Sequence, residues 1–149
     1  MDEWVRNAKE DRPDQSEGID RHVAAIEEHF PECWISGFEP LISGLSLPDP
    51  DDRHVLAAAI RCSAQHIVTD NMKHFPNEEL EVHDMTAVTA DDFLAMTFDL
   101  YVPEAMQVLR QLREIKTNPP FTPSEFLNDM TRKGLPKLAA KAKRNIEFL

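Results

Sequence analysis

The sequence predicts an α/β fold, with a parallel sheet flanked by helices, in residues 1–88, and an all-helical segment in residues 89–149. In the first part, helical and strand-like patterns alternate along the chain, and that order typically builds a parallel sheet. In the second part, helical patterns follow one another with no strand pattern between them. We therefore expect two domains, divided between residues 88 and 89.

The first domain contains three helical and three strand-like patterns. Apolar residues recur every three or four positions in the helices, and short runs that include β-branched residues indicate the strands. His66–Thr69 has the clearest strand pattern, because it is short, rich in β-branched residues and followed by polar residues. The predicted helices are 2–11, 16–30 and 55–60, and the predicted strands are 33–37, 66–69 and 80–83.

Capping residues and prolines mark the helices of the second domain. Thr89 precedes two aspartates by two and three positions, and Thr122 precedes a proline and then Glu125; both arrangements are typical of helix N-caps. Pro119–Pro120 separates two helical patterns, and Gly134 separates the last two. The predicted helices are 89–96, 103–115, 123–130 and one that follows the glycine.

Composition excludes several classes of protein. Of the 149 residues, 42% are hydrophobic and 29% are charged, which is typical of a globular chain that folds without structural metals or disulfides. No apolar run reaches membrane-spanning length, and the N-terminus has no signal-peptide pattern. Because the only cysteines are Cys33 and Cys62, a disulfide framework is excluded and a cytoplasmic location is expected.

The charge is distributed unevenly. The net charge of −11 argues against a surface that coats nucleic acid broadly. Residues 1–95 carry 21 acidic and 7 basic side chains, a net −14, whereas residues 96–149 carry 6 acidic and 9 basic, a net +3. Six basic residues fall in the last eighteen positions. They form either a surface that binds a polyanion or a solvated helix face that interacts favourably with the helix dipole.

Polar residues gather where a predicted strand ends and where a predicted helix begins. Thr69-Asp70-Asn71 follows the clearest strand, and Asp49-Pro50-Asp51-Asp52 precedes the alanine-rich helix. In an open α/β sheet, functional groups collect at the carboxyl ends of strands, and Glu3 on the first helix could reach the same edge. Clustered carboxylates stay ionised only beside a cation, and oxygen ligands favour Mg²⁺ or Mn²⁺, which support phosphoryl chemistry.

Each of these residues also has a purely structural interpretation. Asp52 has the position of a helix N-cap, Thr69-Asp70-Asn71 can form a polar turn, and Glu3 suits the first turn of a helix. His54 and His74 flank the acidic loop and the strand end, where they could contact a phosphate. The sequence contains no glycine-rich phosphate loop, no nucleophile elbow and no Cys-x-x-Cys motif.

Two segments together resemble the PIN-domain family. They are Leu-Pro-Asp-Pro-Asp-Asp-Arg-His-Val-Leu-Ala-Ala-Ala-Ile at 47–60 and Ile-Val-Thr-Asp-Asn-Met-Lys-His-Phe-Pro at 67–76. Residues 119–149 are similar to the tail of the bacterial VapC-type toxins that carry a helical C-terminal extension. This resemblance implies a PIN-like (Rossmann-like) parallel sheet, flanked by helices, whose acidic residues hold Mg²⁺ or Mn²⁺ for endonucleolytic cleavage of RNA.

The resemblance also implies roles for individual residues. Glu3 matches the acid on the family's early helix, and Asp52 matches the aspartate that opens the alanine-rich helix. Thr69 and Asn71 match the polar pair after a strand, where many relatives have an aspartate. The adjacent Asp70 could restore the charge that the asparagine lacks.

The start of the chain departs from the family pattern. Family members begin with a strand that ends in a metal-binding aspartate, ahead of the helix in which this sequence starts. We therefore expect an N-terminally truncated PIN-like fold with a weakened metal site and doubtful activity. Loss of an interior strand costs ladder hydrogen bonds and apolar burial. The chain is then either a fragment or mis-started reading frame, or it compensates by forming a homo-oligomer.

Three functions remain open from the sequence. The first is a ribonuclease toxin of a toxin–antitoxin system, with catalytic Glu3, Asp52, Thr69 and Asn71, metal ligands Glu3, Asp52 and Asp70, and RNA-binding Lys137, Lys141, Lys143 and Arg144. Its partners are an RNA substrate and a cognate antitoxin. The second is a non-catalytic PIN-like module that binds an antitoxin or another protein through an amphipathic helix in a groove. The third is an acidic α/β fold without a site.

Overall fold

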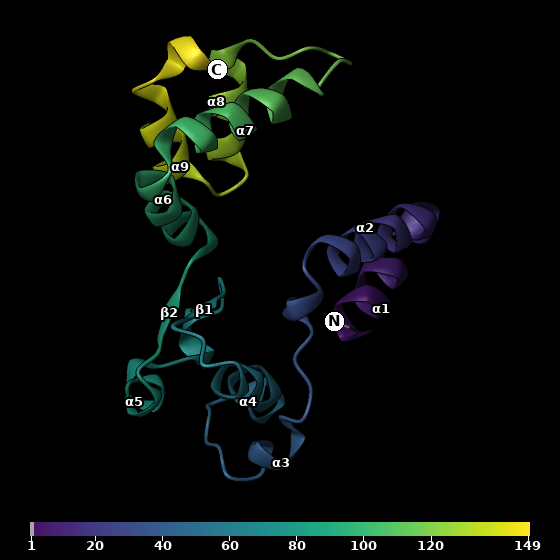
Figure 1. Ribbon diagram of the computed structural model, residues 1–149, viewed down its shortest axis with the longest axis vertical. Helices are drawn as coiled ribbons and strands as arrows, with labels where there is room; N and C mark the ends of the chain where they lie inside the picture. Colours follow the sequence, from purple (N-terminus) through teal and green to yellow (C-terminus); the bar gives the residue numbers. More distant parts are fainter. Residues whose placement is uncertain (1) are drawn as a thin grey trace. The chain divides into compact units, whose positions relative to one another are not determined.

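The computed structural model describes the backbone of residues 2–149 and the side chains of residues 5–149 (Figure 1). The chain divides into two compact units. Unit 1 contains Met1–Leu45 and Arg53–Ser63, and unit 2 contains Ser46–Asp52 and Ala64–Leu149. The domain boundary expected between residues 88 and 89 stays a prediction.

Unit 1 is helical. Its longer helices are α1 (Asp2–Asp11), α2 (Ser16–His29) and α4 (Arg53–Arg61), and α3 (Glu39–Ile42) is a single turn. The helices predicted at 2–11, 16–30 and 55–60 are therefore confirmed. An ion pair of 2.6 Å between Lys9 Nζ and Asp20 Oδ1 joins α1 to α2, and α4 buries Leu56, Ala57 and Ala59. The small alanine side chains suit a closely packed helix face.

The strands predicted at 33–37 and 80–83 are wrong. Pro31–Cys33 forms a 3₁₀ turn, and residues 34–37 after it pair with no strand in the described part of the chain. Residues 80–83 fall in helix α5 (Asn77–Leu80) and the 3₁₀ turn Glu81–His83. Leu80 is fully buried and Val82 is 75% exposed. The apolar–polar order Leu-Glu-Val-His imitates a strand, but a strand would place Leu80 and Val82 on the same face, whereas here they belong to consecutive helical turns and only Leu80 is buried.

The sheet of unit 2 has two parallel strands, as the fold class requires. Strand β1 (His66–Val68) pairs with β2 (Thr86–Val88) in the register Ile67 opposite Ala87, and both central residues are buried. The backbone N–H of Thr69 extends the ladder by donating to the Val88 carbonyl at 2.9 Å. The sheet is smaller than expected, because neither the strand predicted at 33–37 nor the one predicted at 80–83 forms, and β2 is a strand that the sequence patterns did not predict.

A four-helix segment follows the sheet in unit 2. Its helices are α6 (Ala90–Leu100), α7 (Val102–Glu114), α8 (Pro123–Arg132) and α9 (Pro136–Lys143), and a 3₁₀ turn follows at Ile146–Phe148. Both predicted N-caps are confirmed: Thr89 accepts from the Asp92 N–H, and Thr122 forms a capping box with Glu125. Local cap chemistry therefore decides where α6 and α8 begin.

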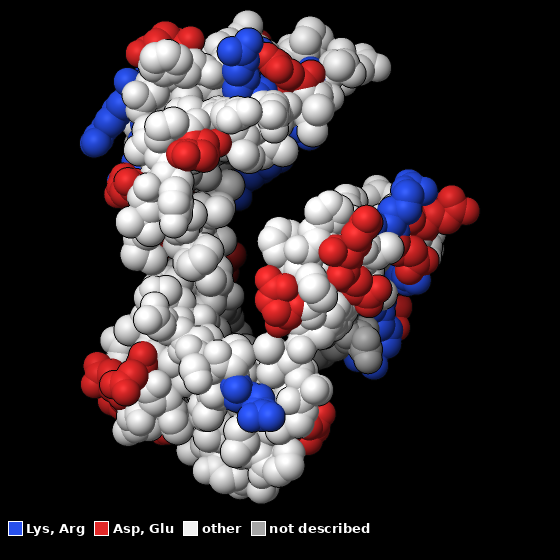
Figure 2. Space-filling view, in the orientation of Figure 1, with Lys and Arg blue, Asp and Glu red and all other residues white. Residues whose placement is uncertain are grey.

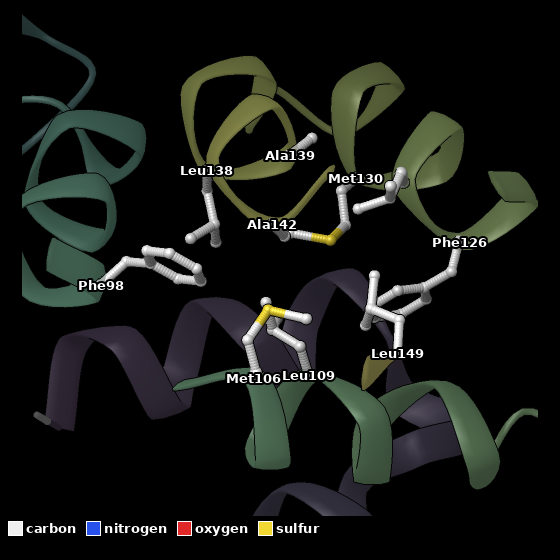
Figure 3. Packing of buried hydrophobic residues seen from close by; sticks show 10 residues of the cluster. Phe98, Met106, Leu109, Phe126, Met130, Leu138, Ala139, Ala142 and Leu149 are labelled. Carbon is white, nitrogen blue, oxygen red and sulfur yellow. The ribbon is translucent and has the colours of Figure 1, made fainter. Parts of the chain in front are cut away.

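The apolar core of this segment joins all four helices. Figure 3 shows Phe98 of α6 and Leu138 of α9 directed toward Met106 and Leu109 of α7. The cluster is made of Phe98, Met106, Leu109, Phe126, Leu127, Met130, Leu138, Ala139, Ala142 and Leu149. No described helix of the protein is long and apolar enough to cross a lipid bilayer.

A buried carboxylate fixes helix α9 onto α6. Asp91 is 6% exposed and accepts from the backbone N–H groups of Lys137 and Leu138, each at 2.9 Å. These are the second and third residues of α9, whose own N-cap residue, Leu135, has no side chain that can cap. Asp91 thus acts as the N-cap of α9, although it lies 46 residues before Lys137 in the chain.

Candidate functional site

The acidic loop before α4 forms a single 3₁₀ turn that pairs two aspartates. Asp52 ends the turn Pro50–Asp52, and its backbone N–H donates to the Asp49 carbonyl at 3.2 Å. The Asp49 carboxylate accepts from the backbone N–H of Asp51 at 3.0 Å. Since residues three apart eclipse one another in a 3₁₀ turn, Asp49 and Asp52 present their carboxylates on the same side.

A second 3₁₀ turn at the carboxyl end of β1 pairs Asn71 with His74 in the same way. The turn covers Met72–His74, and the His74 N–H donates to the Asn71 carbonyl at 3.0 Å. Thr69, directly after the strand, accepts from the Asn71 N–H through its hydroxyl at 3.0 Å. The buried Phe75 follows His74, so the turn is anchored in the core.

The two turns meet at one imidazole nitrogen. His74 Nδ1 lies 2.7 Å from Asp52 Oδ2, 3.5 Å from Asp49 Oδ2 and 2.6 Å from Asn71 Nδ2. An N–H at Nδ1 suits the carboxylates but opposes the amide nitrogen, whereas a lone pair suits the amide but opposes the carboxylates. As placed, no single protonation state of His74 makes good hydrogen bonds to all its neighbours.

The donor set fits a hard divalent cation with some affinity for nitrogen. One ligand atom each from Asp49, Asp52 and His74 lies within 4.8 Å of the others, and all three residues are half-buried. Neighbouring ligands of an octahedral Mg²⁺ or Mn²⁺ ion are about 3 Å apart, so small side-chain adjustments suffice. The conflict around Nδ1 does not itself indicate a cation, because turning the Asn71 amide so that its oxygen faces Nδ1 removes it.

The structure brings some of the predicted site residues together and leaves others untested. Asp52 and Asn71 lie at the group, and Thr69 supports it through the Asn71 backbone. Asp70 has an exposed side chain and is not among the grouped ligand candidates of the described residues. The side chain of Glu3 lies outside the described residues. The roles of Asp70 and Glu3 as ligands therefore stay predictions.

Sequence reasoning missed Asp49 and the direct role of His74. The sequence placed His74 only near the strand end, as a residue that could contact a phosphate. The usable signal was the spacing of three between Asp49 and Asp52, and again between Asn71 and His74. Interpreting that spacing requires knowing that both segments form 3₁₀ turns rather than open loops.

The predicted RNA-binding residues of α9 divide into two pairs. Lys137 bonds to Asp92, and Lys141 Nζ lies 2.5 Å from Asp99 Oδ2, so both lysines face acids of α6. The hydrogen bond to Lys137 lowers the pKa of the Asp92 carboxyl, and Asp92 raises the pKa of the lysine. In the described part of the chain, Lys143 and Arg144 are exposed and have no ion-pair partner.

The surface around α9 is therefore mixed in charge rather than purely basic. Figure 2 shows lysine and arginine side chains beside acidic ones over the four-helix segment. Lys137 and Lys141 form ion pairs with α6, which neither of the two sequence interpretations of the basic residues predicted. Exposed positive charge that is free to meet a phosphate remains at the end of the helix, on Lys143 and Arg144.

Comparison with known proteins identifies a matching family model and a similar curated protein. Residues 90–144 match the family model "VapC50 C-terminal domain". The chain is 41% identical over 108 residues to a Mycobacterium tuberculosis (strain ATCC 25618 / H37Rv) protein named "Putative ribonuclease VapC50". That alignment covers 72% of this chain and 63% of the relative, so the chain spans less than two thirds of the relative's length. No solved structure matches.

Proposed function

Because the chain belongs to the VapC-type toxin family, we propose that it is a PIN-domain endoribonuclease of a toxin–antitoxin system, dependent on Mg²⁺ or Mn²⁺. The observation that carries this proposal is the group formed by Asp49, Asp52 and His74 at the carboxyl end of β1. That edge is where open α/β sheets hold their functional groups. The enzyme acts on RNA in the cytoplasm.

Asp49 and Asp52 hold the ion. Glu3 is a further ligand by the family resemblance, and Asp70 is another that restores the charge lacking at Asn71. A bound Mg²⁺ or Mn²⁺ provides a nucleophile at neutral pH and neutralises charge that develops on the phosphate. The Thr69 hydroxyl already accepts from the Asn71 N–H, which leaves its own hydrogen free to donate to a phosphate oxygen.

The protein's own residues also bind and orient the substrate. Asn71 orients water or RNA from the strand end, where its amide contacts His74. Lys143 and Arg144 contact RNA phosphates, since they are exposed and carry no ion pair in the described part of the chain. Lys137 and Lys141 contribute less, because an RNA would first have to displace Asp92 and Asp99.

The test is cleavage of a single-stranded RNA by the full chain with MnCl₂ or MgCl₂. We expect cleavage that EDTA abolishes and that Asp52→Asn lowers by at least about 100-fold, the size of a typical electrostatic contribution to a transition state. Glu78→Gln, an exposed acid on α5, is the matched control. Equal cleavage by wild type and Asp52→Asn would remove Asp52 from the active site.

A second function, a binding module without catalysis, is favoured by an apolar groove in the four-helix segment. The groove has a volume of about 490 Å³ and is lined almost entirely by apolar side chains from α6 to α9. Tyr101, Val108 and Leu112 contribute exposed apolar surface to it. We propose that it receives an amphipathic helix of the cognate antitoxin. With a co-expressed antitoxin, Val108→Glu should abolish the complex and Asp52→Asn should leave it intact.

A further inference from the structure

One nitrogen donor lies in a site whose other donors are oxygens. Resting on the proposed function, we infer that His74 Nδ1 is a ligand of the divalent ion and makes the site favour Mn²⁺ over Mg²⁺. The nitrogen lies close to both carboxylates, 2.7 Å from Asp52 Oδ2 and 3.5 Å from Asp49 Oδ2. An ion bound by both aspartates would therefore lie within reach of Nδ1.

The backbone holds this imidazole in place before any ion binds. The His74 N–H donates to the Asn71 carbonyl and the Phe75 N–H donates to the Met72 carbonyl, at 3.0 and 3.2 Å. Phe75 is 4% exposed, so the residue after His74 is fixed in the core. The side chain of His74 is itself only 23% exposed. Binding an ion then costs little conformational entropy at this position.

The chemistry of the two ions gives the preference. Mg²⁺ favours oxygen ligands and keeps much of its water, so an imidazole adds little to its affinity. Mn²⁺ is also bound well by carboxylates, and as a first-row transition metal it gains more from a nitrogen ligand. A site of two carboxylates and one imidazole thus favours Mn²⁺ over Mg²⁺ more strongly than an all-carboxylate site does.

The competing interpretation is that His74 only donates a hydrogen bond to Asp52 and orients that carboxylate. Under it, the imidazole never contacts the ion, and replacing His74 weakens Mn²⁺ and Mg²⁺ binding to a similar degree. The two interpretations therefore differ in the ratio of the two affinities and in whether a nitrogen nucleus couples to bound Mn²⁺.

The experiment measures metal binding directly, at one fixed pH, on the full chain without a histidine tag. Mn²⁺ affinity is obtained by calorimetry and from the electron paramagnetic resonance signal of free Mn²⁺, and Mg²⁺ affinity by competition. The variants are His74→Gln, which keeps a polar side chain, and His74→Asp, which replaces nitrogen by carboxylate oxygen. His22→Gln removes an exposed imidazole of α2 and is the control. Circular dichroism checks the fold of each variant.

We expect Mn²⁺ affinity to fall at least about 10-fold in His74→Gln, because even ligand-supporting residues outside the coordination shell cost that much. Mg²⁺ affinity should change less. His74→Asp should bring the ratio of Mn²⁺ affinity to Mg²⁺ affinity closer to one. Pulsed electron paramagnetic resonance should detect ¹⁴N coupling to Mn²⁺ in wild type and His22→Gln but lose it in His74→Gln.

The variant Asp52→Asn distinguishes a failure of the inference about His74 from a failure of the proposed metal site. If that variant loses Mn²⁺ binding while His74→Gln keeps both wild-type affinity and ¹⁴N coupling, the inference about His74 is wrong and the proposed metal site stands. If Asp52→Asn binds Mn²⁺ as wild type does, the site in the proposed function is wrong and the inference falls with it. Parallel losses of Mn²⁺ and Mg²⁺ affinity in His74→Gln, with ¹⁴N coupling absent from wild type, would favour the orienting role and overturn the inference.

Discussion

Replacing Asp91 should weaken the attachment of α9 to α6 and destabilise the fold. In Asp91→Ala, the backbone N–H groups of Lys137 and Leu138 lose their shared acceptor inside a buried contact. Pro136 has no N–H, so the carboxylate satisfies both of the backbone donors that open α9 after the proline. Each hydrogen bond to a charged acceptor contributes about 1.5 kcal/mol net, so we expect a loss of about 3 kcal/mol in the free energy of unfolding.

The measurement is urea and thermal unfolding followed by circular dichroism. For a chain of this size, about 3 kcal/mol lowers the unfolding temperature by roughly 6–12 °C. Hydrogen exchange should speed up most at the Lys137 and Leu138 amides. Asp91→Asn should fall between wild type and Asp91→Ala, because its amide oxygen replaces one of the two accepting oxygens while its NH₂ group, a donor, faces the other backbone N–H.

Asp99→Asn is the matched control, because it breaks an exposed ion pair between the same two helices. Asp99 is 60% exposed beside Lys141, and such a pair contributes about 0–1 kcal/mol. If Asp91→Ala destabilises the protein no more than Asp99→Asn does, the assignment of Asp91 as a cap supplied from another helix is refuted.

Three more outcomes follow from the four-helix segment. Lys143→Gln with Arg144→Gln should reduce the slope of log affinity for single-stranded RNA against log salt by about 1.4, measured by fluorescence anisotropy, and Lys141→Gln should change it less. Hydrogen bonds from the cap threonine lower the pKa of Glu125 below its usual 4.5, so its stabilising effect is complete above that pH and is lost as pH falls through the folded-state pKa; urea midpoints should decline more steeply there in wild type than in Glu125→Gln. Leu109→Ala, at 8% exposure in the core, should cost about 2–5 kcal/mol by urea unfolding, and a cost under about 1 kcal/mol would contradict the packing.

Local chemistry in the sequence determined most helices and one strand. Thr89 and Thr122 cap α6 and α8 where their residue types predict, because an N-cap depends only on groups within one turn. Strand β1 was predicted from its β-branched run. The alternation of apolar residues at Leu80 and Val82, and at Cys33 and Ile35, predicted strands that do not form. A strand also requires a partner elsewhere in the chain to complete its hydrogen bonds.

The candidate site was predicted in part. Asp52, Thr69 and Asn71 came from their positions at a strand end and a helix start, together with the family resemblance. Asp49 and His74 were not identified as candidate ligands, because their contribution depends on two short 3₁₀ turns from different parts of the chain meeting at one nitrogen.

Tertiary structure alone decided what the charged residues of the last helices do. From the sequence, Lys137, Lys141, Lys143 and Arg144 form one basic group. Packing α9 against α6 gives the first two acidic partners and leaves the last two exposed, and it turns Asp91 into a cap for a helix 46 residues away. Sequence patterns report which groups each turn of helix offers. Which of those groups form ion pairs or hydrogen bonds depends on contacts between distant segments, and burial of apolar surface sets those contacts.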